Sequence, residues 1–379
     1  MTSPQVRAAE CKVPNRIVEA SAYVPDWSGL HRSEFIFLDR NENTHPLPPP
    51  VRQALVEAIK NGAVQAYPEA QDLVEPLTRY TGVNPAYLLP TNGSDQGIDL
   101  CLRAVLGEGD MMVTARPEFP VFTQVASTLG ARITPVLYKP DLSFPYAEFT
   151  AALKACRPAA IVLINPNNPT GTSIDLDYIA NVVTTYPNIP VIVDEAYYEY
   201  TEQTVLPLVE AHPNLIVLRT FSKAFAMAGL RLGYIVAAPS LLAHIRKLQN
   251  PFDVNHLAIV AGVAQLARVD EVRAECQYVM EHIKPYVIRA LRRLDVPVWA
   301  GSANFVLVRP SDCARAVTFL RDAGVLVRPM SAVLLAGTFR MSVGTMTQMR
   351  RFVRIFRSYL KNERESRVEG SGYGGAHED

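Results

Sequence analysis

Short apolar runs alternate with stretches of helical periodicity between about residues 91 and 236. The runs have the length of buried strands and lie at 111–113, 133–137, 161–164, 191–193, 215–218 and 234–237. Strands that alternate with helices along a chain pair mostly in parallel, and helices cover both faces of the resulting sheet. This part of the sequence therefore predicts a large α/β domain built on a mostly parallel sheet.

The pattern changes near residue 256. Long helical stretches fill 257–294, and apolar runs follow at 304–308, 325–327 and 339–343, which predicts a smaller α+β domain. We expect an N-terminal segment (1–40) that packs with the smaller domain (256–362), a large domain (41–255), and a disordered tail (363–379) that is polar and rich in glycine at its end. Since no long linker separates the two domains, a site is expected in the cleft between them.

Composition narrows the class of protein. The 379 residues suffice for about two domains, and the 37 basic residues balance the 37 acidic ones, so no nucleic-acid partner is indicated. Five scattered cysteines without a C-x-x-C pair argue against a metal site and favour free thiols in a reducing compartment. The chain has neither an apolar signal core nor about 18 consecutive apolar residues. We therefore expect a cytoplasmic protein that is not embedded in a membrane.

Polar residues follow three of the predicted strands. Asn168 comes after the run 161–164, Asp194 ends the run 191–193, and Lys223 follows the run 215–218. In open α/β sheets the ligand site lies beyond the carboxyl ends of the strands, so these side chains are predicted to converge. A lysine in isolation is more often a solvated surface residue. A lysine that ends a strand beside hydroxyl groups can instead act as a covalent amine.

Two local patterns have a second interpretation. The acidic end of the run 191–193 would also suit magnesium in a nucleotide hydrolase, but the chain has no G-x-x-x-x-G-K-[ST] loop. Gly93, Ser94 and Asp95 open a helical stretch at 96–106, which indicates either a plain helix cap or a phosphate site. Lys223 and Asp194 nearby favour the phosphate interpretation.

Several ordered motifs together resemble those of the fold-type I pyridoxal-phosphate aminotransferases, and more narrowly of the histidinol-phosphate aminotransferase branch. They are Asn-Asn-Pro-Thr-Gly (167–171), Asp-Glu-Ala-Tyr (194–197) and Ser-Lys-Ala-Phe-Ala-Met-Ala-Gly-Leu-Arg-Leu-Gly (222–233). Further matches are Asn-Glu-Asn (41–43), Tyr-Pro-Glu (67–69), Thr-Asn-Gly-Ser-Asp-Gln-Gly (91–97) and Arg-Met-Ser-Val-Gly (340–344). The resemblance spans about residues 20–360 and implies an aspartate aminotransferase-like fold with pyridoxal 5'-phosphate as cofactor.

The resemblance also implies roles around the cofactor ring. Lys223 would bond the cofactor aldehyde and move the proton, and Asp194 would hold the pyridine nitrogen protonated so that the ring acts as an electron sink. Tyr197 and Asn168 would bond the phenolic oxygen, and Phe119 would stack on the ring. Taken alone, Tyr197 and Phe119 could also be core aromatics.

The cofactor phosphate and the partner subunit come next in the family pattern. The resemblance assigns the phosphate to Ser94, Asp95, Ser222 and Arg231, and to a tyrosine from the neighbouring subunit that matches Tyr67. A site shared in this way requires a homodimer, which commonly has two-fold symmetry.

The substrate side follows from the same resemblance. Arg340 matches the arginine that binds an α-carboxylate, and Arg328 matches the arginine that binds the distal phosphate of histidinol phosphate; a bare surface arginine is the alternative for Arg328. Tyr23, Asn43 and Asn304 would line the same pocket. The expected reaction moves an amino group from histidinol phosphate to 2-oxoglutarate.

Three departures from the family pattern leave another donor open. Thr44 and His45 stand where a proline and an aromatic residue are usual, and Asp26 and Trp27 follow Pro25 where glycine is common. The stretch 329–339 is strongly apolar, and an added acid repels a phosphate. The alternative is an aromatic or specialised-metabolite aminotransferase, or a phosphothreonine decarboxylase, on the same scaffold.

Overall fold

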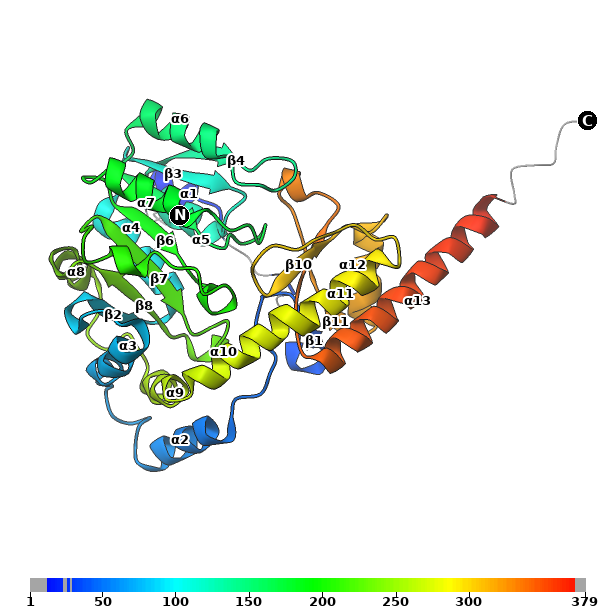
Figure 1. The fold of residues 1–379 in the computed structure, drawn as a ribbon, viewed down its shortest axis with the longest axis horizontal. Helices are drawn as coiled ribbons and strands as arrows, with labels where there is room; N and C mark the ends of the chain where they lie inside the picture. Colours follow the sequence, from blue (N-terminus) through cyan, green and yellow to red (C-terminus); the bar gives the residue numbers. More distant parts are fainter. Residues whose placement is uncertain (1–11, 23–25, 28, 372–379) are drawn as a thin grey trace, which may run out of the picture.

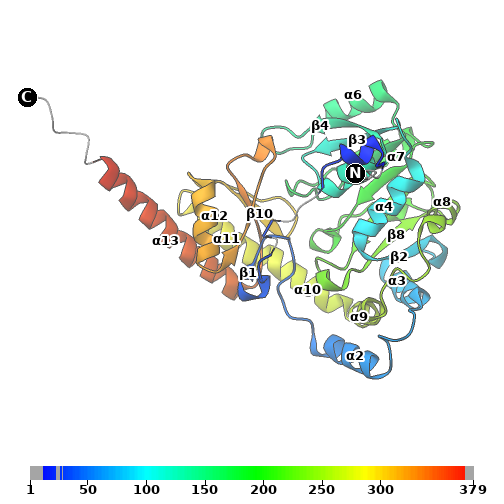
Figure 2. The same ribbon diagram turned by 180° about the vertical axis from the view of Figure 1, so that it is seen from behind.

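The computed structural model describes residues 12–22, 26–27 and 29–371. A large domain around a central sheet stands beside a smaller domain, and the C-terminal helix α13 (Met346–Ser371) runs along the smaller domain and projects away from the large one (Figure 1 and, from behind, Figure 2). Helical structure thus continues to Ser371, into the segment that composition predicted to be a disordered tail. No helix among the described residues combines the length and the apolar character needed to cross a membrane.

The large domain is built on a seven-stranded sheet with the strand order β2-β8-β7-β6-β5-β3-β4. Neighbouring strands are parallel except at β8, which is antiparallel to β2 and to β7. The predicted α/β class with a mostly parallel sheet is confirmed. The pattern did not indicate β2, whose four residues include a proline. The bounds are β2 Leu88–Thr91, β3 Met111–Arg116, β4 Arg132–Leu137, β5 Ala160–Ile164, β6 Val191–Asp194, β7 Leu215–Thr220 and β8 Gly233–Ala237.

Helices cover both faces of this sheet. Along β6, Val191 and Val193 pack into one apolar cluster and Ile192 into the other, so the strand is buried on both sides. This explains why the strands read as unbroken apolar runs rather than as an alternation. One face is covered by α4 (Gly93–Val105), α5 (Pro120–Thr128) and α8 (Pro239–Ile245), and the other by α3 (Val74–Thr81), α6 (Tyr146–Cys156), α7 (Leu176–Thr185) and α9 (His256–Leu266).

The smaller domain has a four-stranded antiparallel sheet with the order β12-β13-β10-β9. The N-terminal segment lies on this domain, because β1 (Ile36–Phe37) pairs in parallel with β11 (Val325–Leu326). The strands are β9 Val298–Trp299, β10 Phe305–Val308, β12 Arg328–Pro329 and β13 Phe339–Ser342. The remaining helices are α1 Asn15–Val18, α2 Pro49–Lys60, α10 Val269–Tyr278, a π-helical turn Val279–Ile283, α11 Lys284–Arg292 and α12 Cys313–Asp322.

Two glycines bring the domains into backbone contact. The amide of Ser302 donates to the carbonyl of Gly171 at 2.7 Å, and Lys284 donates to the carbonyls of Gly301 and Ala303, each at 2.5 Å. A Cβ atom on Gly301 would lie only 1.9 Å from the carbonyl oxygen of Gly171. Since Gly171 ends the turn 167–171, this junction sets the position of the smaller domain relative to Asn168.

We predict that Gly301→Ala destabilises the protein, because its new methyl group meets backbone that cannot rotate away. Overpacking of this kind costs about 1–3 kcal/mol or more. Urea unfolding monitored by circular dichroism measures the loss. Gly229→Ala is the matched control, since a Cβ atom there has no heavy atom within 4 Å and the φ angle is ordinary. If Gly301→Ala were as stable as the wild type, the close contact between Gly301 and Gly171 would not be needed for stability.

Candidate active site

The carboxyl edge of the parallel sheet opens into a cavity of about 1060 Å³. The turn after β5 brings Asn168 to this cavity, the last residue of β6 is Asp194, and the loop after β7 brings Lys223. The three side chains therefore meet where the strand-end argument placed them. The other predicted residues that line the cavity are Ser94, Phe119, Tyr197, Ser222, Arg231, Asp95, Arg328 and Arg340.

Lys223 lies in a setting that favours a reactive amine. Its Nζ donates to the backbone carbonyl of Arg40 at 2.9 Å. Burial, assisted by the positive charge of Arg340, lowers the pKa of Lys223 to about 8. A neutral amine is the nucleophilic form of lysine, so a usable fraction exists near neutral pH.

Asp194 is a buried carboxyl group without a direct ion pair among the described residues. It is 3% exposed, and its Oδ1 accepts the backbone amide of Ala196 at 3.0 Å. It forms no ion pair with any described residue, and burial raises its pKa to about 7. A protonated ring nitrogen placed against this carboxyl group would supply the missing charge and return the pKa to a lower value. The position thus fits a cationic heterocycle at the floor of the cavity.

A candidate anion-binding site lies at the start of α4. Asn92 precedes this helix without a side-chain cap, so the amide groups of the first turn are open to an anion. Arg231 donates to the hydroxyl of Ser222 at 3.2 Å and pairs with Asp95 at 2.7 Å. Gly93 has φ +77°, which favours glycine, and a Cβ atom there would lie 2.7 Å from Nη2 of Arg231 and would displace the guanidinium group. The carboxylate of Asp95 orients Arg231, so Asp95 itself offers a phosphate only its backbone amide.

Separate hydrogen bonds hold the side chains on the cofactor side and on the substrate side of the cavity. The hydroxyl of Tyr197 accepts from the side-chain amide of Asn41 at 2.8 Å. The side-chain oxygen of Asn168 accepts a short hydrogen bond from Arg340, which also donates to the backbone carbonyl of Asp39 at 2.9 Å. Arg340 is thereby held with its guanidinium group at the cavity, in a geometry suited to a carboxylate.

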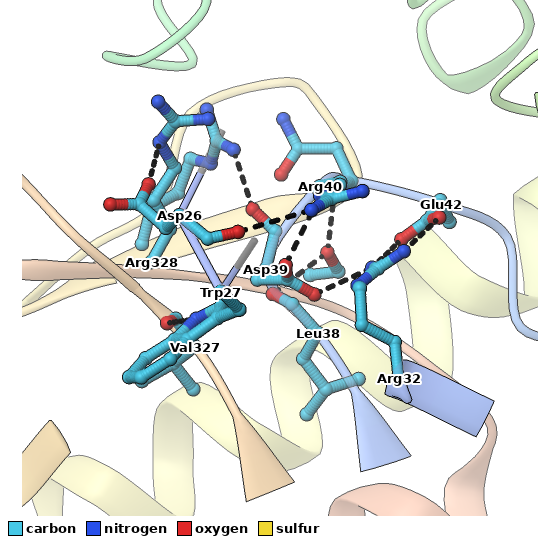
Figure 3. A network of polar contacts seen from close by, with 12 residues as sticks. Asp26, Trp27, Arg32, Leu38, Asp39, Arg40, Glu42, Val327 and Arg328 are labelled. Carbon is cyan, nitrogen blue, oxygen red and sulfur yellow. Dashed lines mark hydrogen bonds and ion pairs between the residues drawn. The ribbon is translucent and has the colours of Figure 1, made fainter. Parts of the chain in front are cut away.

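Arg328 and Arg340 stand side by side. They are register partners on the antiparallel strands β12 and β13, so their side chains leave the sheet on the same face. Arg328 pairs through Nε with the Oδ2 atom of Asp26 at 3.1 Å (Figure 3). The cavity therefore carries two neighbouring guanidinium groups, one of which faces a carboxylate of the protein.

Sequence patterns did not single out a group of charged residues from the N-terminal segment. Arg32 pairs with Asp39 at 2.7 Å and with Glu42 at 2.5 Å, and Arg40 lies 3.4 Å from Asp39 (Figure 3). Arg32, Arg40 and Glu42 line the cavity. The sequence offered one indication of their role, because these residues lie within or close to the motif 41–43 that resembles part of the family site.

Three predicted residues do not line the cavity, and a fourth falls outside the described residues. Asn43 donates to the carbonyl of Ala224 and to Glu275, each at 2.9 Å, and does not line the cavity. Asn304 is 1% exposed and does not line the cavity; its side-chain amide donates to the carbonyl of Asn41 and so stabilises the backbone there. Tyr67 is 76% exposed, away from the cavity of its own chain, and Tyr23 lies outside the described residues.

Comparisons with known proteins agree with this geometry. The family of class I and II aminotransferases matches residues 33–356. The chain is 36% identical to a histidinol-phosphate aminotransferase of Symbiobacterium thermophilum, over 94% of this chain and 97% of that enzyme. It is 33% identical to a histidinol-phosphate aminotransferase of Thermoanaerobacter sp. (strain X514), over 81% and 88%. Its structure resembles that of the histidinol-phosphate aminotransferase of Sinorhizobium meliloti in complex with pyridoxal-5'-phosphate, with a TM-score of 0.77 and 25% identity over 86% and 91%.

Proposed function

Because the chain belongs to the class I and II aminotransferases, we propose that it transfers the amino group of histidinol phosphate to 2-oxoglutarate. The relatives named for this donor, 33–36% identical over most of the chain, support the choice. The observation that carries it is the pair of neighbouring arginines, Arg340 and Arg328, beside the lysine and the aspartate at the strand ends. One arginine suits the carboxylate of an amino or keto acid, and the other suits a distal anion.

Pyridoxal phosphate is the cofactor of this family, as the sequence motifs predicted. When bound, it supplies an aldehyde for the amino group and a ring that accepts the electron pair of the donor α-carbon. We propose that the carboxyl group of Asp194, which has no ion pair among the described residues, binds the ring nitrogen. The phosphate would bind at the start of α4, with Ser94, Ser222 and Arg231 as donors. Phe119 lies at the cavity to stack on the ring.

Lys223 would bond the cofactor aldehyde in the resting enzyme. Its amine, whose pKa burial lowers to about 8, would then take the proton from the donor α-carbon and hold it for transfer. Tyr197 and Asn168, which line the cavity, would hydrogen-bond the phenolic oxygen of the cofactor. Because Asn168 also contacts Arg340, the same residue links the cofactor edge to the substrate carboxylate.

A homodimer completes the site. Tyr67 stacks on Phe252 with ring centroids 4.3 Å apart, although both side chains are at least half exposed. Val56, Ile59 and Val64 are exposed nearby in the sequence, on and just after α2. Apolar side chains gathered in this way mark an association surface, and a two-fold copy would bring Tyr67 to the cofactor phosphate of its partner. The free cysteines Cys101 and Cys276, both buried, suit the reducing cytoplasm.

The purified protein with pyridoxal phosphate is expected to form glutamate from 2-oxoglutarate when histidinol phosphate is supplied. Lys223→Ala should abolish this turnover and remove the absorbance band that depends on the bond between the lysine and the cofactor aldehyde, since covalent participants act as a unit with losses of many orders of magnitude. Glutamate production measured by a coupled dehydrogenase assay checks both. Turnover at near wild-type rate in Lys223→Ala would overturn the assignment of the lysine. Turnover of other donors but not of histidinol phosphate would overturn the donor.

Asp194→Asn is expected to retain the cofactor but to lower kcat by about 10²- to 10³-fold, the usual loss when one preorganised electrostatic contact is removed. The amide cannot hold the ring nitrogen protonated, whereas the phosphate donors are unchanged. Cofactor content by absorbance and single-turnover kinetics separate the two effects. Full activity would reduce Asp194 to a structural strand-end residue.

Mixing Lys223→Ala subunits with Tyr67→Phe subunits tests the shared site. In a mixed dimer one site carries both lesions and the other carries neither, so activity should reappear on mixing, provided that Tyr67→Phe alone is impaired. Sedimentation measures the dimer, and differently tagged subunits verify exchange. If exchange occurs without recovery, Tyr67 acts within its own chain.

A further inference from the structure

Asp26 occupies the substrate end of the cavity and faces Arg328. The carboxylate oxygen lies 3.1 Å from Nε of the guanidinium group, and the two side chains are 35% and 19% exposed. Both residues line the cavity, together with Pro329, Met330 and Ala332. The contact is therefore a partly exposed ion pair in the lining of the cavity, beside apolar side chains that a distal group of a substrate could contact.

The segment that carries Asp26 is fixed from two sides. Nε1 of Trp27 donates to the backbone carbonyl of Val327, next to Arg328, at 3.0 Å, and Trp27 adopts a φ angle of +61°. Arg40 donates from Nη2 to the backbone carbonyl of Asp26 at 3.0 Å (Figure 3). A bulky residue with positive φ is uncommon and needs such support. The carboxylate is thus held against Arg328 by the surrounding backbone.

The charge of Arg328 has opposite consequences for two kinds of donor. A neutral distal group would desolvate a bare guanidinium group without giving it a counter-ion, which is unfavourable. With Asp26 in place, the arginine keeps its partner while a neutral group packs on Pro329, Met330 and Ala332. A distal phosphate, in contrast, must share the arginine with a carboxylate that repels it.

We propose that Asp26 is a built-in counter-ion of Arg328 that sets the donor preference of this site, admitting donors with a neutral distal group and weakening the hold on a distal phosphate. The proposal rests on the aminotransferase function proposed above and extends it to a second substrate class. Asp26 acts through Arg328, so it is a positioning residue and not a catalytic one.

Histidinol phosphate and histidinol form a matched pair of donors, because they differ only in the phosphate. Asp26→Asn retains the hydrogen-bond acceptor and removes the charge. It should raise kcat/KM for histidinol phosphate and lower it for histidinol, each by about two- to fivefold, as expected for a half-exposed ion pair. The change should lie in KM, because the reacting atoms are untouched. An unchanged ratio of the two donors would overturn the proposal.

Two further variants separate the charge effect from a general disturbance. In an Arg328→Ala background, Asp26→Asn should leave the ratio of the two donors unaltered, since the cation it compensates is gone. Glu19→Gln removes the same charge from the N-terminal segment, at an exposed position outside this cavity, and should leave both donors as in the wild type. A shift of the ratio by Asp26→Asn in the Arg328→Ala background would show that Asp26 does not act through Arg328. An equal shift in Glu19→Gln would show that any lost negative charge in the segment has this effect, and would overturn the specific role of Asp26.

Ligand binding without turnover distinguishes this proposal from the proposed function. Calorimetry on the cofactor-loaded Lys223→Ala protein measures the Kd of each donor, with and without Asp26→Asn. If Asp26→Asn binds histidinol phosphate more tightly and histidinol more weakly, the proposed role of Asp26 as counter-ion is supported, even if the wild type turns over neither compound. If the wild type turns over histidinol phosphate but Asp26→Asn does not change the two Kd values in this way, the proposed role of Asp26 is wrong and the aminotransferase function still stands.

Discussion

The guanidinium group of Arg340 joins the three parts of the molecule that enclose the cavity. It extends from β13 of the smaller domain, contacts Asn168 in the large domain and donates to the carbonyl of Asp39 in the N-terminal segment. It is 4% exposed, and a buried arginine is tolerated only where its donors find acceptors. The same contacts that satisfy the arginine therefore connect the two domains and the N-terminal segment around the cavity.

The N-terminal segment is accordingly a wall of the site. The amide of Ser342 donates to the carbonyl of Leu38 at 2.8 Å, and the amide of Asn41 donates to the hydroxyl of Ser342 at 2.9 Å. These bonds place the carbonyl of Arg40 beside Lys223. The segment also contributes charged residues to ion pairs at the cavity, where Arg32 pairs with Asp39 and Asp26 pairs with Arg328 of the smaller domain. Paired charges of this kind adjust how strongly the remaining cations attract an anionic substrate.

The cofactor side of the site could be predicted from the sequence because its residues are tied to strand ends. A buried parallel strand needs a continuous apolar run, and the residue that follows the run must emerge at the carboxyl edge of the sheet. Asn168, Asp194 and Lys223 obey this rule, and local periodicity is enough to find them. Gly93 and Ser94 could also be predicted from the sequence, since a helix that starts after a strand is a local feature.

The sequence alone determined the α/β class, the strand-end constellation and the family to which its motifs belong, because each depends on residues close together in the chain. The pairing of Asp26 with Arg328, the displacement of Asn43 and Asn304 from the pocket, and the contact of Gly171 with Gly301 join residues far apart in the sequence. Only the tertiary structure decided them, since the partner of a charged or small residue is set by which backbone segments pack against each other. The contact that we propose to set the donor preference belongs to that second group, because it joins the N-terminal segment to the smaller domain.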